Sequence, residues 1–177
     1  MLTLARDSQT EALIQKSRFV SLAFRADSED AFRRQLEEIR RRFPGANHYV
    51  FAYVIREADG RQCIRFSDDG EPHNSAGRPV LAPIQGRDLT NAAVVVVRYF
   101  GGIKLGVGGL VRAYGGGASS ALDVAGIRPL TRRESGSLVL DYAALPEAER
   151  RLKAEGAEIV RKEFGEKVTL FFEKEIV

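Results

Sequence analysis

Several residue types that mark particular protein classes are scarce in this 177-residue chain. It has no tryptophan, one cysteine (Cys63) and two histidines (His48 and His73). One cysteine cannot form an internal disulfide, and two histidines are too few for a histidine-based metal site without help from carboxylates. We therefore expect neither a disulfide framework nor a structural metal, and we interpret Cys63 as an ordinary core or strand residue.

Long hydrophobic runs are missing as well. No apolar run approaches the ~20 residues that a membrane helix needs, and the N-terminus, MLTLARDSQTEAL, lacks the apolar core of a signal peptide. These absences, with an unpaired cysteine, predict a cytoplasmic protein. The sequence also contains no G-x-S-x-G elbow, Walker loop or C-x-x-C motif. With 44% hydrophobic and 29% charged residues, the chain has the composition of an ordinary globular protein.

Positive charge gathers in the middle of the chain, although the net charge is only +3. Residues 86–133 hold seven Lys and Arg against two Asp, and they contain ten of the 17 glycines. A positive, glycine-rich segment attracts phosphate-bearing partners. The alternative is that these cations form ordinary solvated surface.

The most informative stretch is VVVVRYFGGIKLGVGGLVR, residues 94–112. A buried strand that ends in a glycine-rich turn places free backbone N–H groups beside fixed positive charges, an arrangement that suits phosphate or carboxylate. Tyr99 and Phe100 either stack on bases or belong to the core. The predicted anion- or nucleic-acid-binding residues are Arg98, Tyr99, Phe100, Gly101, Gly102, Lys104, Gly106, Gly108, Gly109 and Arg112.

The loop SDDGEP, residues 67–72, holds three carboxylates within four positions. Such a group either binds Mg²⁺ or positions a base, or it forms a plain turn at Asp69-Gly70. The candidate residues of this loop are Ser67, Asp68, Asp69, Gly70, Glu71, Ser75 and Arg78, and any metal would be held by Asp68, Asp69 and Glu71.

Hydrophobic periodicity divides the first part of the chain into alternating strands and helices. Residues 11–25 predict strand–turn–strand, and a helix capped at Asp27 or Ser28 follows until Pro44-Gly45. A hairpin is expected over 47–56 and 61–66 around Ala58-Asp59-Gly60. A short helical segment over 78–85, a buried strand over 91–99 and a helix in the later half of 107–125 come next.

Residues 127–136 are predicted to form a boundary, because Pro129 and the charged run Arg132-Arg133-Glu134 interrupt the pattern. Beyond it we expect a strand at 137–142, a helix at 144–155, and a hairpin of 157–163 and 167–173. This β-α-β-β order is about two thirds of a ferredoxin-like half-sandwich.

The segments SRFVSLA (17–23), SDDGEP with AGRP (67–79) and GRDLTNAAVVVVRYFGGIKLGVGGLVRAYG (86–115) resemble the YigZ/IMPACT family. The chain departs from the family's pattern at His73-Asn74-Ser75, where a small residue, Gly and Thr are usual. Asn tolerates the left-handed backbone that Gly would take, and Ser75 would then carry the hydroxyl of the Thr.

The resemblance implies an α+β protein of two domains. Residues 1–133 would form an α/β sandwich of the type seen in the second domain of ribosomal protein S-five, and residues 134–177 a ferredoxin-like domain that lacks its last helix and strand. The resemblance also implies a bacterial family member that acts in the regulation of translation.

Three functional hypotheses remain open. The first is a non-enzymatic module that binds RNA, the ribosome or a translation factor through the basic glycine-rich surface. The second is an enzyme that acts on a phosphorylated or carboxylated small molecule, with a metal at SDDGEP. The third is a protein–protein regulatory module in which these loops only hold the fold. No cofactor, catalytic residue or oligomeric state is predicted.

Overall fold

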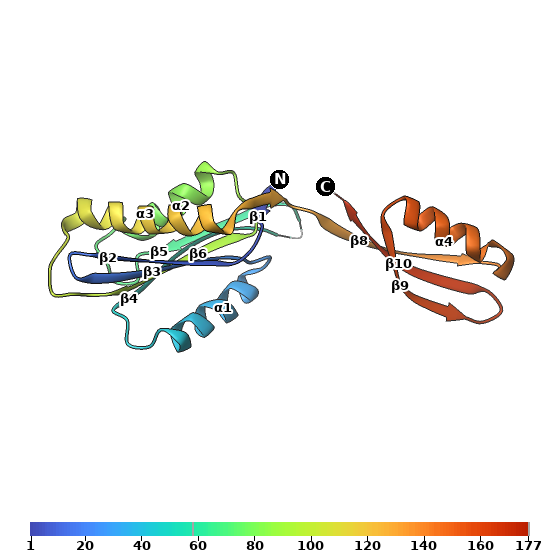
Figure 1. Cartoon of the computed structure of the whole chain (residues 1–177), viewed down its shortest axis with the longest axis horizontal. Coiled ribbons are helices and arrows are strands. Elements are labelled where there is room, and N and C mark those ends of the chain that lie inside the picture. Colours follow the sequence, from blue (N-terminus) through green and yellow to red (C-terminus); the bar gives the residue numbers. More distant parts are fainter. Residues whose placement is uncertain (58, 177) are drawn as a thin grey trace. The chain divides into compact units, whose positions relative to one another are not determined.

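The structure is a computed structural model that describes residues 1–57 and 59–176, with residues 132, 133 and 176 described as backbone only. The chain forms two compact units, Met1–Pro129 and Leu130–Val177 (Figure 1). The division lies earlier than the predicted one at 133/134, because the first strand of the second unit already begins at Arg132. The protein has an α+β fold. No helix within the described residues is long and apolar enough to span a membrane.

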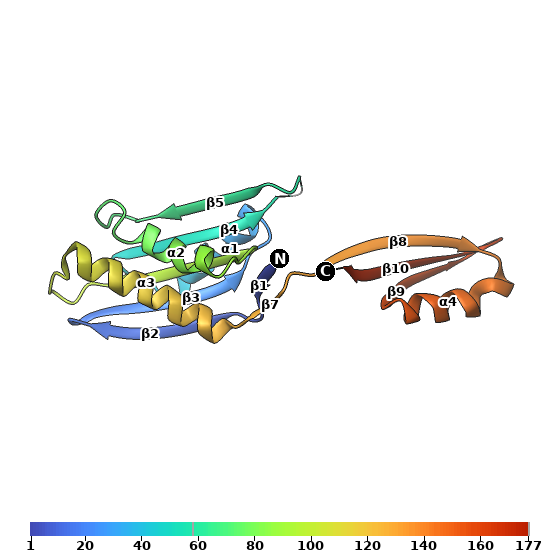
Figure 2. The same ribbon diagram turned by 90° about the horizontal axis from the view of Figure 1, so that it is seen from above.

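The larger unit is built on a five-stranded antiparallel sheet in the order β2-β3-β6-β4-β5. Helices α2 and α3 cover one face of this sheet and α1 covers the other (Figures 1 and 2). The bounds of these elements are β2 Ser8–Ile14, β3 Ser17–Arg25, α1 Glu29–Arg42, β4 His48–Arg56, β5 Gln62–Ser67, α2 Gly77–Gly86, β6 Ala92–Tyr99 and α3 Gly106–Ala125.

Strand β6 is the central strand of the sheet and is buried on both faces, as its unbroken run of valines predicts. Val94 and Val96 pack beneath α2 and α3, whereas Val95 and Val97 pack beneath α1. Because β6 is held on both faces, the start of the glycine-rich loop that follows Tyr99 has a defined position at the end of the sheet.

Helix α1 forms where its sequence predicts it. The Ser28 side chain caps the helix by accepting a hydrogen bond from the N–H of Ala31. Phe32, Leu36 and Ile39 lie on one face of the helix and are buried against the sheet. The hairpin of β4 and β5 is also as predicted, although its turn at Ala58-Asp59-Gly60 includes residue 58, which lies outside the described residues.

Helix α3 is longer than predicted, since it spans Gly106–Ala125 and not only the later half of 107–125. Glycine weakens an isolated helix by up to about 1 kcal/mol per residue, but here tertiary packing determines the outcome. A Cβ atom at Gly117 would lie 2.5 Å from Ser21 Oγ on the sheet. The small residues therefore let the helix approach the sheet closely.

The segment predicted as a boundary, residues 127–136, contains two strands. Strand β7, Ile127–Pro129, pairs with β1, Leu2–Leu4, and closes the larger unit. Strand β8, Arg132–Leu140, opens the second unit. The sequence analysis missed β7, because its partner β1 lies at the other end of the larger unit's sequence. Strand β8 begins five residues before the strand predicted at 137–142.

The smaller unit has the predicted β-α-β-β order. After β8, a short 3₁₀ turn at Tyr142–Ala144 leads into α4, Leu145–Ala154, and then into β9, Ala157–Phe164, and β10, Val168–Ile176. The sheet order is β8-β10-β9, so that β10 lies between the two strands joined by α4. Leu152, Val168 and Leu170 form its small core.

Candidate functional site

The two motifs singled out in the sequence lie at the same end of the five-stranded sheet. Strands β5 and β6 are both antiparallel to β4, so they run parallel to each other and end at the same edge. The SDDGEP loop follows β5, and the glycine-rich loop follows β6. The Nη1 atom of Arg98 lies 2.6 Å from Oε1 of Glu71, which joins the two loops directly.

Glu71 is the centre of this contact. Its side chain is only 4% exposed. Its Oε1 atom accepts hydrogen bonds from Arg98 and from the hydroxyl of Tyr114 on α3, both at 2.6 Å, and His48 Nε2 lies 3.7 Å away. One carboxylate oxygen thereby connects β4, β6, α3 and the SDDGEP loop.

The side chain of Arg98 is also buried, with 5% of its surface exposed. Its Nη2 atom donates to Ser17 Oγ at 3.3 Å, and its guanidinium lies 5.4 Å from the ring centres of Phe19 and Phe100. Its Nε atom is the one buried side-chain nitrogen or oxygen without a partner among the described residues. The positive charge of Arg98 is therefore balanced by Glu71 and does not face solvent.

Tyr114 completes the buried network. Its side chain is fully buried, and its ring meets Phe19 edge-on with centroids 5.3 Å apart. Burial, and then the hydrogen bond to Glu71, raise the pKa of Tyr114 well above its ordinary range. The phenol is therefore neutral and remains a donor to the carboxylate.

The other two carboxylates of SDDGEP hold the backbone. Asp68 accepts hydrogen bonds from the N–H groups of Asn74, Ala76 and Gly77, at 2.8, 3.1 and 2.8 Å, and so satisfies free donors at the start of α2. Asp69 Oδ2 accepts from the N–H of Tyr49 at 2.6 Å, at the start of β4.

These contacts bear on the metal hypothesis. Asp68, Asp69 and Glu71 are each bound to different groups. Within residues 1–57 and 59–176, no cluster of three or more His, Cys, Asp or Glu side chains is arranged to hold an ion. A metal at this loop would have to displace the bonds that shape it.

The remaining loop residues also support the loop. Ser67 Oγ accepts from the N–H of Asp69, and the buried Ser75 donates to the carbonyl of Pro72 at 2.6 Å. Asn74 has a φ of 59°, the left-handed conformation expected for the residue that replaces Gly. Arg78 is exposed on α2, and Gly70 is a turn residue with a φ of 89°.

Two positions of the glycine-rich loop require glycine, one because the backbone of another segment lies close to it and one because of its φ angle. A Cβ atom at Gly101 would lie 1.9 Å from the carbonyl oxygen of Lys16 in the β2–β3 turn, so no other residue fits there. Gly102 has a φ of 89°, a conformation open mainly to glycine. Gly106, Gly108 and Gly109 lie in the first turn of α3.

Lys104 and Arg112 differ from Arg98, because both are exposed and neither forms a hydrogen bond or ion pair with another described residue. They flank the first two turns of α3. The N-cap residue of that helix, Leu105, provides no side-chain cap. The start of α2 is capped by Asp68, but the start of α3 presents free N–H groups and the positive end of its dipole.

A cleft of about 370 Å³ opens beside this helix start. Its walls are mainly apolar, and the Glu71–Arg98 pair, His48 and Lys104 contribute its polar groups. It is lined by His48, Glu71, Pro72, Arg98, Phe100, Lys104, Leu105, Gly106, Val107 and Leu110.

Tyr99 does not belong to the cleft. It packs on the α1 face, its hydroxyl donates to the carbonyl of Pro44 at 3.2 Å, and Arg18 lies over its ring.

Three residues of the site, His48, Ser17 and Tyr114, were not predicted from the sequence. Tyr114 is the only aromatic residue of α3 and lies four residues after Leu110, a spacing that would have placed it on the same helix face.

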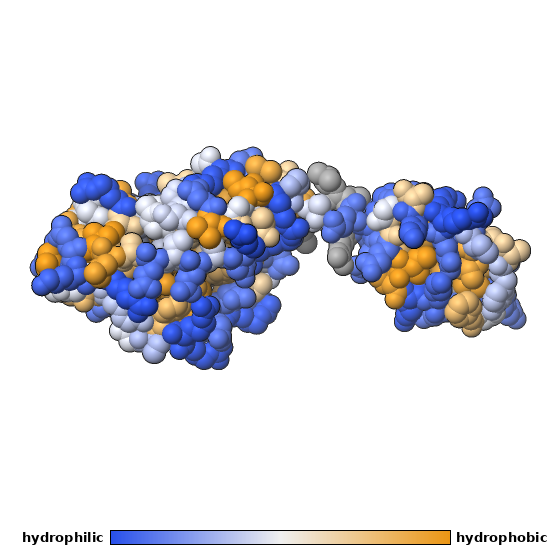
Figure 3. All heavy atoms as spheres, in the orientation of Figure 1, coloured by the Kyte–Doolittle hydropathy of each residue, from blue (hydrophilic) through white to orange (hydrophobic). Residues whose placement is uncertain are grey.

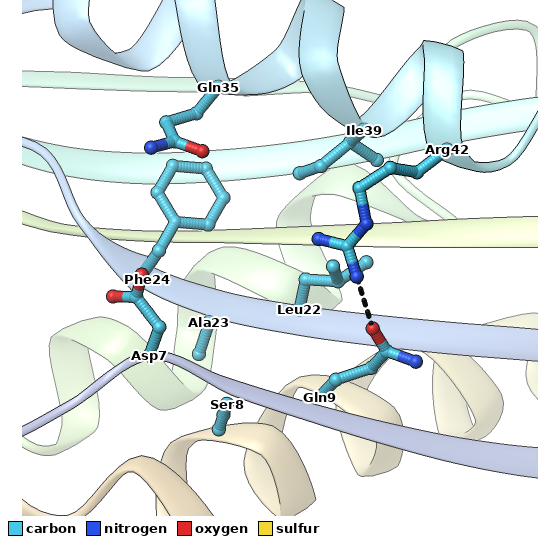
Figure 4. Close-up of a pocket in the computed structure, with 9 residues that line it drawn as sticks. All are labelled: Asp7, Ser8, Gln9, Leu22, Ala23, Phe24, Gln35, Ile39 and Arg42. Carbon is cyan, nitrogen blue, oxygen red and sulfur yellow. Dashed lines mark hydrogen bonds between the residues drawn. The ribbon is translucent and has the colours of Figure 1, made fainter.

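A second cavity, of about 270 Å³, lies between α1 and strands β2 and β3 (Figure 4). Arg42 and Gln9 are joined across it by a hydrogen bond of 2.9 Å. It contains none of the site residues predicted from the sequence. The residues that line it are Asp7, Ser8, Gln9, Leu22, Ala23, Phe24, Gln35, Ile39 and Arg42.

Comparisons with known proteins show which family the chain belongs to. The model of the Impact N-terminal domain matches residues 15–122, which include the cleft. An Escherichia coli protein, IMPACT family member YigZ, is 46% identical over 109 residues, covering 62% of this chain and 53% of that protein. The Bacillus subtilis IMPACT family member YvyE is 39% identical over 153 residues, covering 85% of this chain and 69% of that protein.

A crystal structure described only as that of a hypothetical protein is similar as well. It has a TM-score of 0.72 and 35% identity, and the match covers 98% of this chain and 84% of that one. This chain spans only about half the length of the Escherichia coli relative.

Proposed function

This chain belongs to the IMPACT family, and we propose that it is a non-enzymatic binding protein that acts in translation. Its surface of contact is the end of the larger unit that carries Lys104, Arg112 and the start of α3. The partner is RNA, the ribosome or a translation factor. The link to translation is what membership of the IMPACT family implies.

The observation that carries the proposal is the difference between Arg98 and its basic neighbours. Arg98 is neutralised by Glu71, but Lys104 and Arg112 have no partner among the described residues. Two exposed, unpaired cations beside uncapped helix N–H groups are suited to bind the anionic oxygens of a macromolecule.

The enzyme hypothesis has less support from the same site. It needs Asp68, Asp69 and Glu71 as metal ligands, yet their oxygens accept bonds from backbone N–H groups, Arg98 and Tyr114. These groups form a scaffold beneath the cleft, and Lys104 is the exposed cation that lines it.

The test is sedimentation of the purified chain with ribosomes and, separately, with ribosomal RNA at increasing salt. Because anionic contacts release counterions, the affinity should fall steeply between about 50 and about 200 mM salt. Failure to bind either one at low salt, or an affinity independent of salt, would contradict the proposal.

A further inference from the structure

Apolar side chains are exposed at the same end of the larger unit. Phe100, Ile103, Val107 and Val111 have exposed fractions between 40% and 59%. They lie in the loop before α3 and on its first two turns, where Figure 3 shows orange atoms on the surface. We call these four side chains the apolar patch. Val107 and Val111 are four residues apart and so share one face of the helix.

The apolar patch continues into the cleft. Phe100 and Val107 belong to both, and Leu105 and Leu110 extend the apolar wall inward. The volume of about 370 Å³ lies within the range of pockets that receive ligands or inserted side chains. An occupant would therefore meet apolar surface first at the patch and then inside the cleft.

The side chains of the apolar patch favour a protein over a nucleic acid as the binding partner. Surfaces that bind single-stranded RNA stack its bases on aromatic rings, but three of the four patch residues are branched aliphatic side chains without a flat face. Protein interfaces, in contrast, place apolar side chains at the centre and charged ones around them. Lys104 and Arg112 stand beside the patch in that way.

The charge of the site then defines the partner's chemistry. Glu71 is the one carboxylate among the described residues that line the cleft, and it is buried against Arg98. The accessible charge is therefore that of Lys104, Arg112 and the free N–H groups of α3. A complementary segment carries carboxylates.

We infer that this site binds an acidic, amphipathic protein segment, which inserts an apolar side chain into the cleft and places carboxylates on Lys104, Arg112 and the start of α3. The inference rests on the proposed function and specifies its partner. Apolar anchors with flanking charges are how a helix is recognised in a groove.

The test is a selection of random-peptide display libraries on the immobilised chain. We expect the selected peptides to combine apolar residues at helical spacing with an excess of Asp and Glu. Their affinity should fall about tenfold or more on V107S/V111S and on K104E/R112E, a loss of about 1.4 kcal/mol or more. V124S is the matched control, because Val124 is also exposed on α3, at its other end, and it should bind as the wild type does.

Thermal melting and circular dichroism of each variant verify that it is folded. The inference is overturned if no peptide is selected, if the selected peptides lack an excess of acids, or if V107S/V111S binds them unchanged. A chain that binds ribosomal RNA in a salt-dependent way but selects no acidic peptide would refute the inference and leave the proposed function standing. Salt-independent association with ribosomes would refute the proposed function itself.

Discussion

The carboxylate of Glu71 and the guanidinium of Arg98 lie 2.6 Å apart, and each side chain is about 95% buried. The pair joins a loop after β5 to the end of β6, 27 residues later in the chain. It is the scaffold under the cleft, and it explains why the basic end of β6 presents Lys104 and Arg112 to solvent but not Arg98.

Removing one partner of this pair should destabilise the protein strongly. Glu71→Ala leaves the charge of Arg98 buried without compensation, which typically costs about 3–5 kcal/mol. Urea denaturation measures the change in unfolding free energy. The double variant E71L/R98M should recover part of the loss, and a cost below about 1 kcal/mol for the single variant would show that the pair contributes little.

Tyr114→Phe should lower stability and change its dependence on pH. The variant removes a donor to a buried carboxylate, at a cost of about 1–3 kcal/mol. The folded protein holds the pKa of Tyr114 above its ordinary value, so this stabilisation is fully present below about pH 10 and is lost as the pH rises towards the folded-state pKa.

The stability difference between the wild type and Tyr114→Phe should therefore shrink above about pH 10. Tyr142→Phe, at an exposed tyrosine of the smaller unit, is the control. A difference that stays constant to high pH would contradict the role of the phenol proton.

Asp68→Ala should weaken the start of α2. Three N–H groups lose their acceptor, and loss of a helix cap costs about 0.5–2 kcal/mol. Asp27→Ala, at an exposed aspartate, should have little effect.

Because the oxygens of Asp68 are occupied by the backbone, millimolar Mg²⁺ should not raise the melting temperature of the wild type, and a clear rise would favour the enzyme hypothesis.

Two glycine substitutions should have opposite effects. Gly101→Ala places a methyl group against the carbonyl of Lys16 and should destabilise the protein by more than about 2 kcal/mol through overpacking. At Gly116, within α3, a Cβ atom meets nothing within 4 Å, so Gly116→Ala should stabilise by about 0.5–1 kcal/mol. Equal effects in thermal melting would show that the close approach at Gly101 is relieved by a small shift.

Much of the fold followed from local patterns, while the site depended on contacts between distant residues. The periodicity of α1 and the valine run of β6 predicted both elements, because each is a local signal of burial. The first half of α3 was missed, since its glycines disfavour an isolated helix, whereas tertiary packing, such as that of Gly115 against Pro79, stabilises it here.

The role of Arg98 illustrates the same limit of local patterns. The arginine at the end of β6 was predicted to bind an anionic ligand. In the structure its anionic partner is Glu71, a side chain of the protein itself. The closeness of the two loops follows from the strand order β6-β4-β5, which depends on pairing across the whole sheet.

Lys104 and Arg112 are thus proposed to form the contact surface above the buried scaffold of Glu71 and Arg98. The most direct test compares ribosome binding by K104E/R112E with that of R25E/R34E, which makes the same charge change at two exposed arginines of the larger unit, on β3 and on α1. We predict that the first variant binds at least about tenfold more weakly than the wild type, and that R25E/R34E binds nearly as the wild type does. Equal losses in the two variants, or none in the first, would contradict the claim.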